Sequence, residues 1–322
     1  MSLHINSPKR FLGALLVLTS FLLSCNKDDE NDEAPSNQTI TEVVVANNDY
    51  STLESAVIKA NLQTTLAGAG PFTVFAPDDA AFNASGVTSL NSLSSEQLAT
   101  ILLYHTLTNE VPAASVPAGP NAKITTASGD SVFVTRNTAG VFINGIKVEQ
   151  ADINASNGII HRVGRVLMPP SGDLVTTAQV EGSGLDSLVK AVLRAANGAG
   201  GDPSLLTSLQ SSTLTVFAPN NEAFTQLLST LGVPDINDIP VATLLAVLQY
   251  HVVPGRAFSS DFGNGSLEML AGGSTTVNLT NGANGGPSIT GGSATTNKAN
   301  IVATNIMATN GVVHVIDAVL LP

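Results

Sequence analysis

Residues 73–82 read Thr-Val-Phe-Ala-Pro-Asp-Asp-Ala-Ala-Phe, and residues 215–224 repeat this stretch as Thr-Val-Phe-Ala-Pro-Asn-Asn-Glu-Ala-Phe. The second stretch starts 215 − 73 = 142 residues after the first. A repeat period of this length holds a whole domain, because the units of solenoid proteins span only roughly 20–45 residues. The sequence therefore predicts that one domain has been duplicated.

Two further landmarks return in the same order in both halves, at offsets of 146 and 153 residues. They are Tyr104-His105, which returns as Tyr250-His251, and Asn157-Gly-Ile-Ile-His161, which returns as Asn310-Gly-Val-Val-His314. Offsets that grow slowly along the chain are typical of loop insertions in one of two copies. We therefore expect the copies at residues 39–170 and 171–322, which meet around Pro169-Pro170 and Ser171-Gly172.

An amphipathic helix is predicted near the start of each copy. In the first copy, Ser51 and Glu54 have the spacing of a capping box at the beginning of this helix. The apolar positions recur at helical spacing and are expected to face the core. They are Leu53, Ala56, Val57 and Ala60 in the first copy, and Leu185, Leu188, Val189, Val192 and Leu193 in the second.

A short buried strand follows in each copy, at residues 73–76 and 215–218, and a proline ends it. The residues after that proline are Asp78-Asp79 in the first copy and Asn220-Asn221 in the second. Carboxylates and amides both cap helices, so we expect a short capped helix here. It would bury Phe82 or Phe224.

A stronger helix leads directly into each Tyr-His pair, and Ser94 with Gln97 is predicted to cap the first of these two helices. Asp238 and Pro240 stand at the start of the second. The pattern then changes to the alternation of β-strands. The expected strands are 131–135, 141–148 and 159–167 in the first copy, and 275–280, 300–303 and 312–321 in the second. Helices early and strands late predict an α+β fold with a mostly antiparallel sheet.

The first residues resemble an export signal. Lys9 and Arg10 precede an uncharged apolar run at residues 11–23, which is too short to span a bilayer of roughly 30 Å but suits a signal peptide. The Leu-Leu-Ser-Cys sequence that ends at Cys25 resembles the lipobox of bacterial lipoproteins. We therefore expect residues 1–24 to be removed and Cys25 to be lipidated. A plain secretory signal is the alternative.

Residues 25–38 form an acidic, non-periodic stretch that is predicted to be a disordered tether. A cysteine followed by acids resembles the export signal of surface lipoproteins in the Bacteroidota. This resemblance implies an exported protein that is lipid-anchored to the outer membrane, either on the cell surface or on the periplasmic face. A simple solvated spacer is the other interpretation of this segment.

The composition excludes several kinds of partner and site. The formal charge of −12 becomes −14 without residues 1–24, because Lys9 and Arg10 are lost and no acidic residue is lost with them. A protein this acidic is not expected to bind nucleic acid or anionic lipid headgroups, so its membrane contact should come from the lipid on Cys25. As the single cysteine, Cys25 also excludes intramolecular disulfides and cysteine-based metal sites.

The recurring segments are similar to fasciclin (FAS1) domains. The Thr-Val-Phe-Ala-Pro stretch resembles the first conserved box of that family, the Asn-Gly-x-x-His segments resemble the second box, and Tyr-His matches a short motif between them. The resemblance covers nearly all of the chain after residue 38. It implies two tandem domains, each a β-wedge or β-sandwich flanked by short helices.

The resemblance also implies a function in adhesion or interaction with extracellular protein or glycan. The Tyr-His region is linked to receptor binding in animal members, so the candidate ligand-binding residues are Tyr104, His105, Tyr250 and His251. Only the second copy continues with Val253-Pro254-Gly255, so the inference transfers more readily to that copy.

Neither the histidines nor the carboxylates form a pattern that predicts catalysis. The histidine of each Asn-Gly-x-x-His segment falls in an alternating strand, where a core residue bonded to the backbone is expected rather than a metal ligand. The chain contains no Gly-x-Ser-x-Gly elbow. The Asp78-Asp79 pair becomes Asn220-Asn221 in the second copy, and amides cannot act as general acids or bases. We predict no catalytic residue, no metal site and no cofactor.

Three functions remain open from the sequence. The first is a surface-displayed adhesion or interaction lipoprotein. The second is a structural accessory lipoprotein of an envelope complex, which would also suit acidic domains on a tether. The third is an enzyme that acts on polysaccharide, for which no motif was found.

Overall fold

The structure is a computed structural model that describes residues 37–322 except 88, 181 and 293–296. The predicted signal peptide, Cys25 and most of the tether lie outside the described residues. Within the described part of the chain, no helix has the length and apolar character needed to cross a membrane. Two seven-stranded sheets are present, one in each half of the chain.

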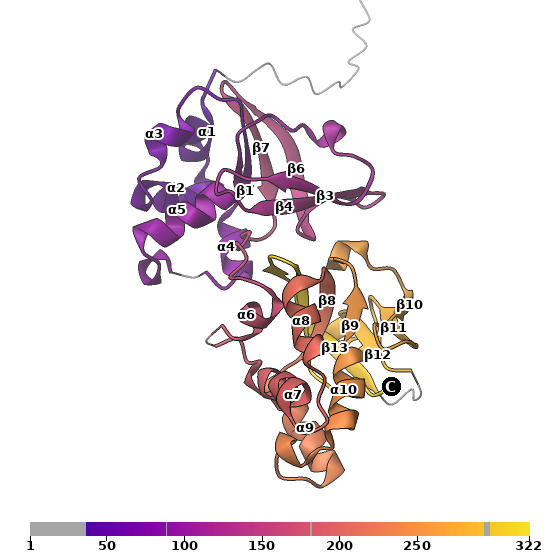
Figure 1. Ribbon diagram of the computed structural model, residues 1–322. Helices are drawn as coiled ribbons and strands as arrows, with labels where there is room; N and C mark the ends of the chain where they lie inside the picture. Colours follow the sequence, from indigo (N-terminus) through magenta and orange to yellow (C-terminus); the bar gives the residue numbers. More distant parts are fainter. Residues whose placement is uncertain (1–36, 88, 181, 293–296) are drawn as a thin grey trace, which may run out of the picture. The chain divides into compact units, whose positions relative to one another are not determined.

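The first half combines short helices with one sheet. Its helices are α1 (Ile40–Ala46), α2 (Ser51–Lys59), α3 (Gln63–Leu66), α4 (Asp79–Ala84) and α5 (Ser95–Tyr104), with 3-10 turns at Asn48–Tyr50, Leu90–Ser92 and Ala113–Ser115. Its strands are β1 (Phe72–Pro77), β2 (Thr106–Leu107), β3 (Gly119–Thr125), β4 (Ser131–Asn137), β5 (Gly140–Ile143), β6 (Ile146–Ala155) and β7 (Gly158–Val163). The strand order is β2-β1-β7-β6-β5-β4-β3. In Figure 1, α1, α2, α3 and α5 gather on one side of β1 and β7.

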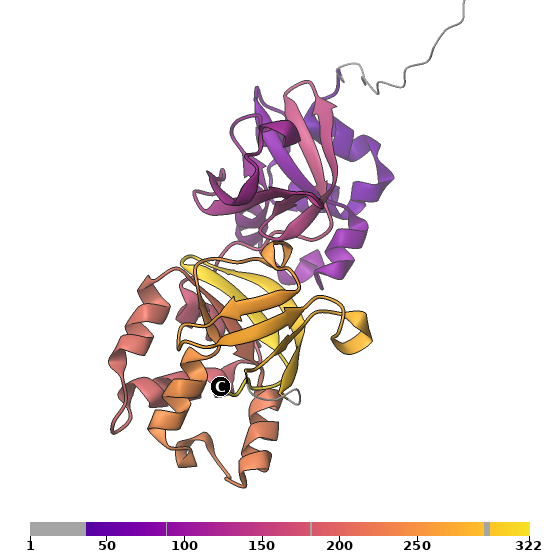
Figure 2. The same ribbon diagram turned by 90° about the vertical axis from the view of Figure 1, so that its right-hand side faces the viewer.

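The second half repeats this plan. Its helices are α6 (Leu174–Ala178), α7 (Asp186–Asn197), α8 (Pro203–Ser211), α9 (Asn221–Leu231) and α10 (Val241–Gln249), with 3-10 turns at Ile236–Asp238, Ser259–Asp261 and Ala283–Gly285. Its strands are β8 (Leu214–Pro219), β9 (Val252–Pro254), β10 (Gly265–Glu268), β11 (Ser274–Asn278), β12 (Ser288–Thr290), β13 (Lys298–Ala308) and β14 (Gly311–Ile316). The strand order β10-β11-β12-β13-β14-β8-β9 is that of the first half read from its other end. Figure 2 shows the helices of this half together, beside and below its yellow and orange strands.

The centre of each sheet is a parallel pair made by the first and the last long strand. In the first half, β1 and β7 run in register from Phe72 opposite Gly158 to Pro77 opposite Val163. β8 and β14 make the same pair in the second half. The remaining pairings are antiparallel.

Alternation along the central strands places neighbouring residues in different core clusters, on opposite faces of the sheet. Val74 and Ala76 of β1 pack with the helices, whereas Phe75 between them faces the outer strands β4, β5 and β6. Phe217 of β8 takes the position of Phe75 in the second half. The sheet thus has helices on one face and its own outer strands folded over the other, which is a sandwich-like arrangement.

A bulge in the long strand makes this folding possible. The register of β6 against β7 shifts twice between Val148 and Ile153, and Asp152 adopts a positive φ of 58° inside the shifted segment. β13 shifts in the same way, with Asn305 at a φ of 62°. Such bulges bend a strand and increase its twist, which turns the outer strands back over the sheet.

The predicted α+β class and the tandem organisation are confirmed, but several local predictions were wrong. The expected strand 141–148 is two strands, because Asn144-Gly145 forms a tight turn with both residues at positive φ. The helix α1 before α2 was not anticipated, nor were β3, β10 and β12. On α7, Leu193 is 40% exposed instead of buried, and Val189 is only partly buried.

The capping box predicted at Ser51 and Glu54 is also absent from α2. Tyr50 occupies the N-cap position and makes no side-chain capping bond. Asp79 from another helix instead accepts from the Thr52 amide in the first turn of α2 and from the Ser51 hydroxyl. The box predicted at Ser94 and Gln97 is present at the start of α5 with both reciprocal hydrogen bonds.

Candidate functional site

The Tyr-His pairs lie where α5 and α10 end and the edge strands β2 and β9 begin. The Nδ1 atom of His105 lies 2.8 Å from the Ile101 carbonyl oxygen, and the Leu167 amide donates to its Nε2 atom at 2.8 Å. Because Nε2 accepts a hydrogen bond, the ring is neutral and its Nδ1–H donates to Ile101. His105 therefore fastens the last turn of α5 to the segment that follows β7.

His251 makes the same two bonds in the second half. Its Nδ1–H donates to the Val247 carbonyl at 2.7 Å, and the Leu320 amide donates to its Nε2 atom at 2.8 Å. Burial lowers the pKa of His105 and of His251 to about 4, which keeps both rings neutral near pH 7.

The two tyrosines hold the outer strands. Tyr104 donates its hydroxyl hydrogen to the Ser131 carbonyl of β4 at 3.0 Å, and Asn144 donates to the same hydroxyl oxygen. Tyr250 donates to the Ser274 carbonyl of β11 at 2.7 Å. Burial raises the pKa of the Tyr104 phenol to about 12. Each tyrosine thus connects a helix end to the strands on the opposite face of the sheet.

All four candidate ligand-binding residues are buried, and their polar atoms are bonded mainly to the backbone. Tyr104 and His105 come together at one point of the first half, and Tyr250 and His251 at the matching point of the second. A role of these residues in ligand binding stays a prediction. His105 and His251 each line an apolar pocket, so a ligand that meets either ring does so from within that pocket.

The histidines of the second box hold the bulges of the long strands. The Asp152 amide donates to Nδ1 of His161 at 3.1 Å, and Nε2–H of His161 donates to the Val111 carbonyl at 3.0 Å. His314 makes the matching contacts with the Asn305 amide and the Ala257 carbonyl. The predicted role as core residues bonded to the backbone is confirmed for both. Burial lowers the pKa of His161 below its usual range and that of His314 to about 4.

The adjacent carboxylates of the first box are helix caps. Asp78 caps its own helix α4 by accepting from the Ala81 amide at 2.8 Å. Asp79 instead reaches back to α2, where it accepts from the Thr52 amide at 2.8 Å and the Ser51 hydroxyl at 2.7 Å. Both carboxylates are therefore bound to helix N-termini, as their chemistry favours.

The second half replaces both carboxylates with amides and keeps both functions. Asn220 caps α9 by accepting from the Ala223 amide, and Asn221 accepts from the Ser187 amide at 2.9 Å. Asn221 also donates to Asp186 through its amide nitrogen. The prediction that these positions cap helices is confirmed, although Asp79 and Asn221 cap a neighbouring helix rather than their own.

The asparagine of the second box joins the helices to the sheet. Asn157 accepts from the Ile40 amide through Oδ1 and donates through Nδ2 to the Leu66 and Gly68 carbonyls. It thus holds the start of α1 and the end of α3. Asn310 repeats this arrangement: its Oδ1 atom accepts from the Leu174 amide, and its Nδ2 atom donates to the carbonyls of Leu209 and Ser212, each at 2.9 Å.

An apolar pocket lies between the helices and the sheet in each half. In the first half it is bounded by α1, α2, α3, β1 and the end of α5, and in the second by the matching elements α6, α7, α8, β8 and α10. The sequence did not reveal these pockets. One available signal was the apolar Val45 and Ile58, which do not belong to the buried helix stripes and are 53% and 49% exposed beside the first pocket.

The described residues provide little for metal or acid–base chemistry. Among residues 37–322, apart from the undescribed positions, no group of three or more His, Cys, Asp or Glu side chains is placed to hold a metal ion. Both ring nitrogens of His105, His161, His251 and His314 are already engaged with backbone groups. These histidines can stabilise the fold, but they present no free nitrogen to a substrate.

Comparison with known proteins agrees with this architecture. The family model described as "Fasciclin domain" matches residues 48–169 and 192–322. A 139-residue stretch, 42% of this chain, is 37% identical to Protein sll1483 of Synechocystis sp. and covers 76% of that protein. A stretch of equal length is 33% identical to the transforming growth factor-beta-induced protein ig-h3 of Sus scrofa, of which it covers 20%.

A solved structure of a FAS1 domain pair from the insect cell adhesion molecule fasciclin I was also found. The match covers 88% of this chain and 96% of that chain, with 17% identity and a TM-score of 0.39. The family model alone accounts for more than half of the residues, and it matches once in each half. The chain belongs to the fasciclin domain family and carries two such domains in tandem.

Proposed function

We propose that this protein is an envelope-anchored lipoprotein whose two fasciclin domains act as adhesion or interaction modules for extracellular protein or glycan. The observation that carries the proposal is that the residues shared by the two domains have structural roles. The landmarks that recur in both domains, from Asp79 to His314, are engaged in capping, strand bonding and core packing. Such domains present stable surfaces rather than reactive side chains, which suits binding.

The anchoring part of the proposal rests on the sequence around Cys25. The lipobox-like Leu-Leu-Ser-Cys and the acidic segment after it support a lipid anchor followed by a spacer. The proposed location is the outer membrane, with the domains facing the cell exterior. A periplasmic orientation is the alternative arrangement of the same anchor.

Protease treatment of intact cells tests the location. Release of the two domains without cell lysis is expected, while a periplasmic marker protein stays intact. A Cys25→Ser variant should leave the membrane fraction altogether, because the acceptor thiol for the lipid is lost. Protection of the domains in intact cells would reject surface display, and membrane retention of the variant would reject the lipid anchor.

The interaction role has its own test. Purified protein is probed against arrays of glycans and matrix proteins, and a deletion strain is compared with its parent for surface attachment. We expect a defined ligand class and weaker attachment of the deletion strain. If one stoichiometric envelope protein cross-links to the chain and attachment is unchanged, the accessory role is correct instead. Reproducible polysaccharide turnover by the purified protein would overturn both.

A further inference from the structure

The pocket of the first domain is a cavity of about 180 Å³. Its deeper wall is apolar and comes from α1, α2, α3 and α5, with Ile40, Val44, Leu53, Val57, Leu66 and Leu102. Thr41, Glu54 and Gln63 also line it. The exposed side chains of Val45 and Ile58 also belong to the lining. The rest of it comes from β1, the end of α5 and β2, with Val74, Phe75, His105 and Thr106. The cavity is therefore an apolar chamber with a few polar groups in its wall.

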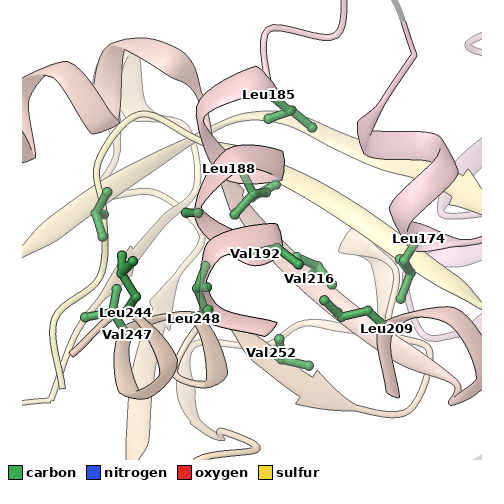
Figure 3. Packing of buried hydrophobic residues seen from close by; sticks show 14 of the residues in the cluster. Leu174, Leu185, Leu188, Val192, Leu209, Val216, Leu244, Val247, Leu248 and Val252 are labelled. Carbon is green, nitrogen blue, oxygen red and sulfur yellow. The ribbon is translucent and has the colours of Figure 1, made fainter. Parts of the chain in front are cut away.

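The same place in the second domain is nearly filled, with a cavity of only about 40 Å³. The nine-residue α8 stands where the first domain has the four-residue α3, and it inserts Leu205 and Leu209. Figure 3 shows Leu209 beside Val216 and Leu174 in this cluster, with Leu188 and Val192 of α7 nearby. The two domains share the pocket's position but not its free volume.

The polar groups of the wall also differ between the domains. The amides of Ile40 in α1 and Leu174 in α6 donate to matching asparagines, Asn157 and Asn310, so these two residues are equivalent. The next residue is therefore Thr41 in the first domain and Val175 in the second. In the same way, the amides of Thr52 in α2 and Ser187 in α7 donate to the matching residues Asp79 and Asn221, so Thr52 and Ser187 are equivalent. Two residues further on, the first domain has Glu54 and the second has Val189. The second pocket is thus apolar at both positions.

Thr41 is the residue that points to a ligand. Its Oγ1 atom is buried and has no hydrogen-bond partner among the described residues. A buried hydroxyl without a partner is unfavourable, because its lost hydration is not replaced. Valine has nearly the same shape without this penalty, and the second domain has valine there. A ligand that hydrogen-bonds to Thr41 would replace the hydrogen bonds to water that the hydroxyl loses on burial.

The size and charge of the cavity define the ligand further. An engineered apolar cavity of about 150 Å³ is large enough to bind benzene, so the first cavity can hold a ring of that size with a substituent. Glu54 in the wall disfavours an anion. The other residues of the lining carry no positive side chain to attract one, since His105 is neutral in its hydrogen bonds. We propose that the first domain binds a small neutral molecule with an apolar body the size of an aromatic ring and one hydroxyl group that hydrogen-bonds to Thr41.

The test adds phenol, toluene or benzoate to the purified full chain. Binding is detected through the NMR chemical shifts of the protein's methyl groups. Phenol should shift the signals of Val44, Val57 and Leu66, and should leave those of Leu188 and Val192 in the second domain unchanged. Toluene should bind the same site more weakly, and benzoate should not bind. Saturable phenol shifts that arise in the second domain, or none at all, would overturn the proposal.

Thr41→Val is the decisive variant, because it copies the second domain and removes only the hydroxyl. It should fold, and it should bind phenol about fivefold more weakly while toluene affinity changes less than about twofold, since one neutral hydrogen bond is lost. Unchanged phenol affinity would show that Thr41 does not contact the ligand. Val44→Leu should weaken both probes by reducing the cavity, and Val175→Thr in the second domain should create no new site. This proposal stands or falls independently of the adhesion role.

Discussion

The amide of Leu167 donates a hydrogen bond of 2.8 Å to Nε2 of His105, which lies 62 residues earlier in the chain. This bond requires an unprotonated nitrogen, because a histidinium ring has no acceptor. The same requirement holds for His251, to which the Leu320 amide donates. The neutral form of histidine is therefore part of the folded structure of both domains.

We predict that both domains lose stability as the pH falls from about 6.5 to about 4. The folded-state pKa of His105, His251 and His314 is about 4, because burial lowers it from the ordinary value of 6.5. The unfolded chain therefore binds more protons in this window, and lowering the pH favours unfolding. A shift from 6.5 to about 4 corresponds to roughly 3 kcal/mol for each fully buried histidine. Urea midpoints at pH 7.5, 6.0 and 5.0, at constant ionic strength, measure the effect.

The double variant His105→Gln/His251→Gln is the control for this pH dependence. Its amide side chains do not titrate, so the slope of stability against pH should become shallower even though the variant starts less stable. A wild-type stability that is constant or rises between pH 6.5 and 5 would contradict the prediction. NMR titration of the ring protons should show these histidines neutral in the folded protein above pH 5.

Asp79→Ala should destabilise the first domain by about 1 kcal/mol, the usual effect of removing a helix cap. Asp79→Asn should change stability by only a few tenths, because Asn221 performs this function in the second domain. Urea unfolding measures both variants, and Asn221→Ala should reproduce the alanine effect in the second domain. Equal losses for Asp79→Asn and Asp79→Ala would show that the carboxylate charge is required.

Asn157→Asp should be more damaging, at about 2–4 kcal/mol. The change replaces the amide that donates to the Leu66 and Gly68 carbonyls with an oxygen that repels them. The exposed Asn83→Asp in α4 is the matched control and should stay within about 0.5 kcal/mol of the wild type. Chemical unfolding followed by circular dichroism distinguishes them, and similar midpoints for the two variants would contradict the role of Asn157.

Gly158→Ala should prevent stable folding of the first domain. An added Cβ would lie 2.0 Å from the Phe72 carbonyl oxygen, and relief of this clash requires β7 to move away from β1. Gly140 also has a positive φ, but its nearest neighbour to an added Cβ is 4.0 Å away. Gly140→Ala should therefore cost only about 1–3 kcal/mol through backbone strain. Thermal unfolding of both variants measures the difference in stability, and equal melting temperatures would contradict the predicted clash at Gly158.

The sequence predicted what depends on short stretches of chain. The repeat correctly indicated two tandem domains, and the spacing of Ser94 and Gln97 correctly identified a cap. The prediction of one strand over residues 141–148 was wrong, although Asn144-Gly145 is the usual sequence signal of a hairpin turn. Asp79 was recognised as a capping residue, but its spacing suggested its own helix, whereas the fold brings it to α2, 27 residues earlier.

Features that depend on distant segments could not be predicted. The parallel pairing of β1 with β7 joins strands that start at Phe72 and Gly158, and no local pattern indicates their direction. The candidate residues Tyr104 and His105 were found, but their bonds to Ser131 and Leu167 show only in three dimensions. The unpartnered hydroxyl of Thr41 is equally invisible in the sequence, since a threonine on a short helix is usually solvated.

The parallel pair of β1 and β7 also determines how the first domain would carry mechanical load. A tether at the N-terminal end and a bound partner toward the C-terminal end would pull the start of β1 and the end of β7 in opposite directions. Once the preceding helices have been drawn out, this pull acts along both strands, so the hydrogen bonds from Phe72 to Val163 are sheared together rather than opened one by one. β8 and β14 would bear force in the same way. Each domain should therefore behave as a shear-loaded link, and single-molecule pulling would show it as two high-force unfolding events.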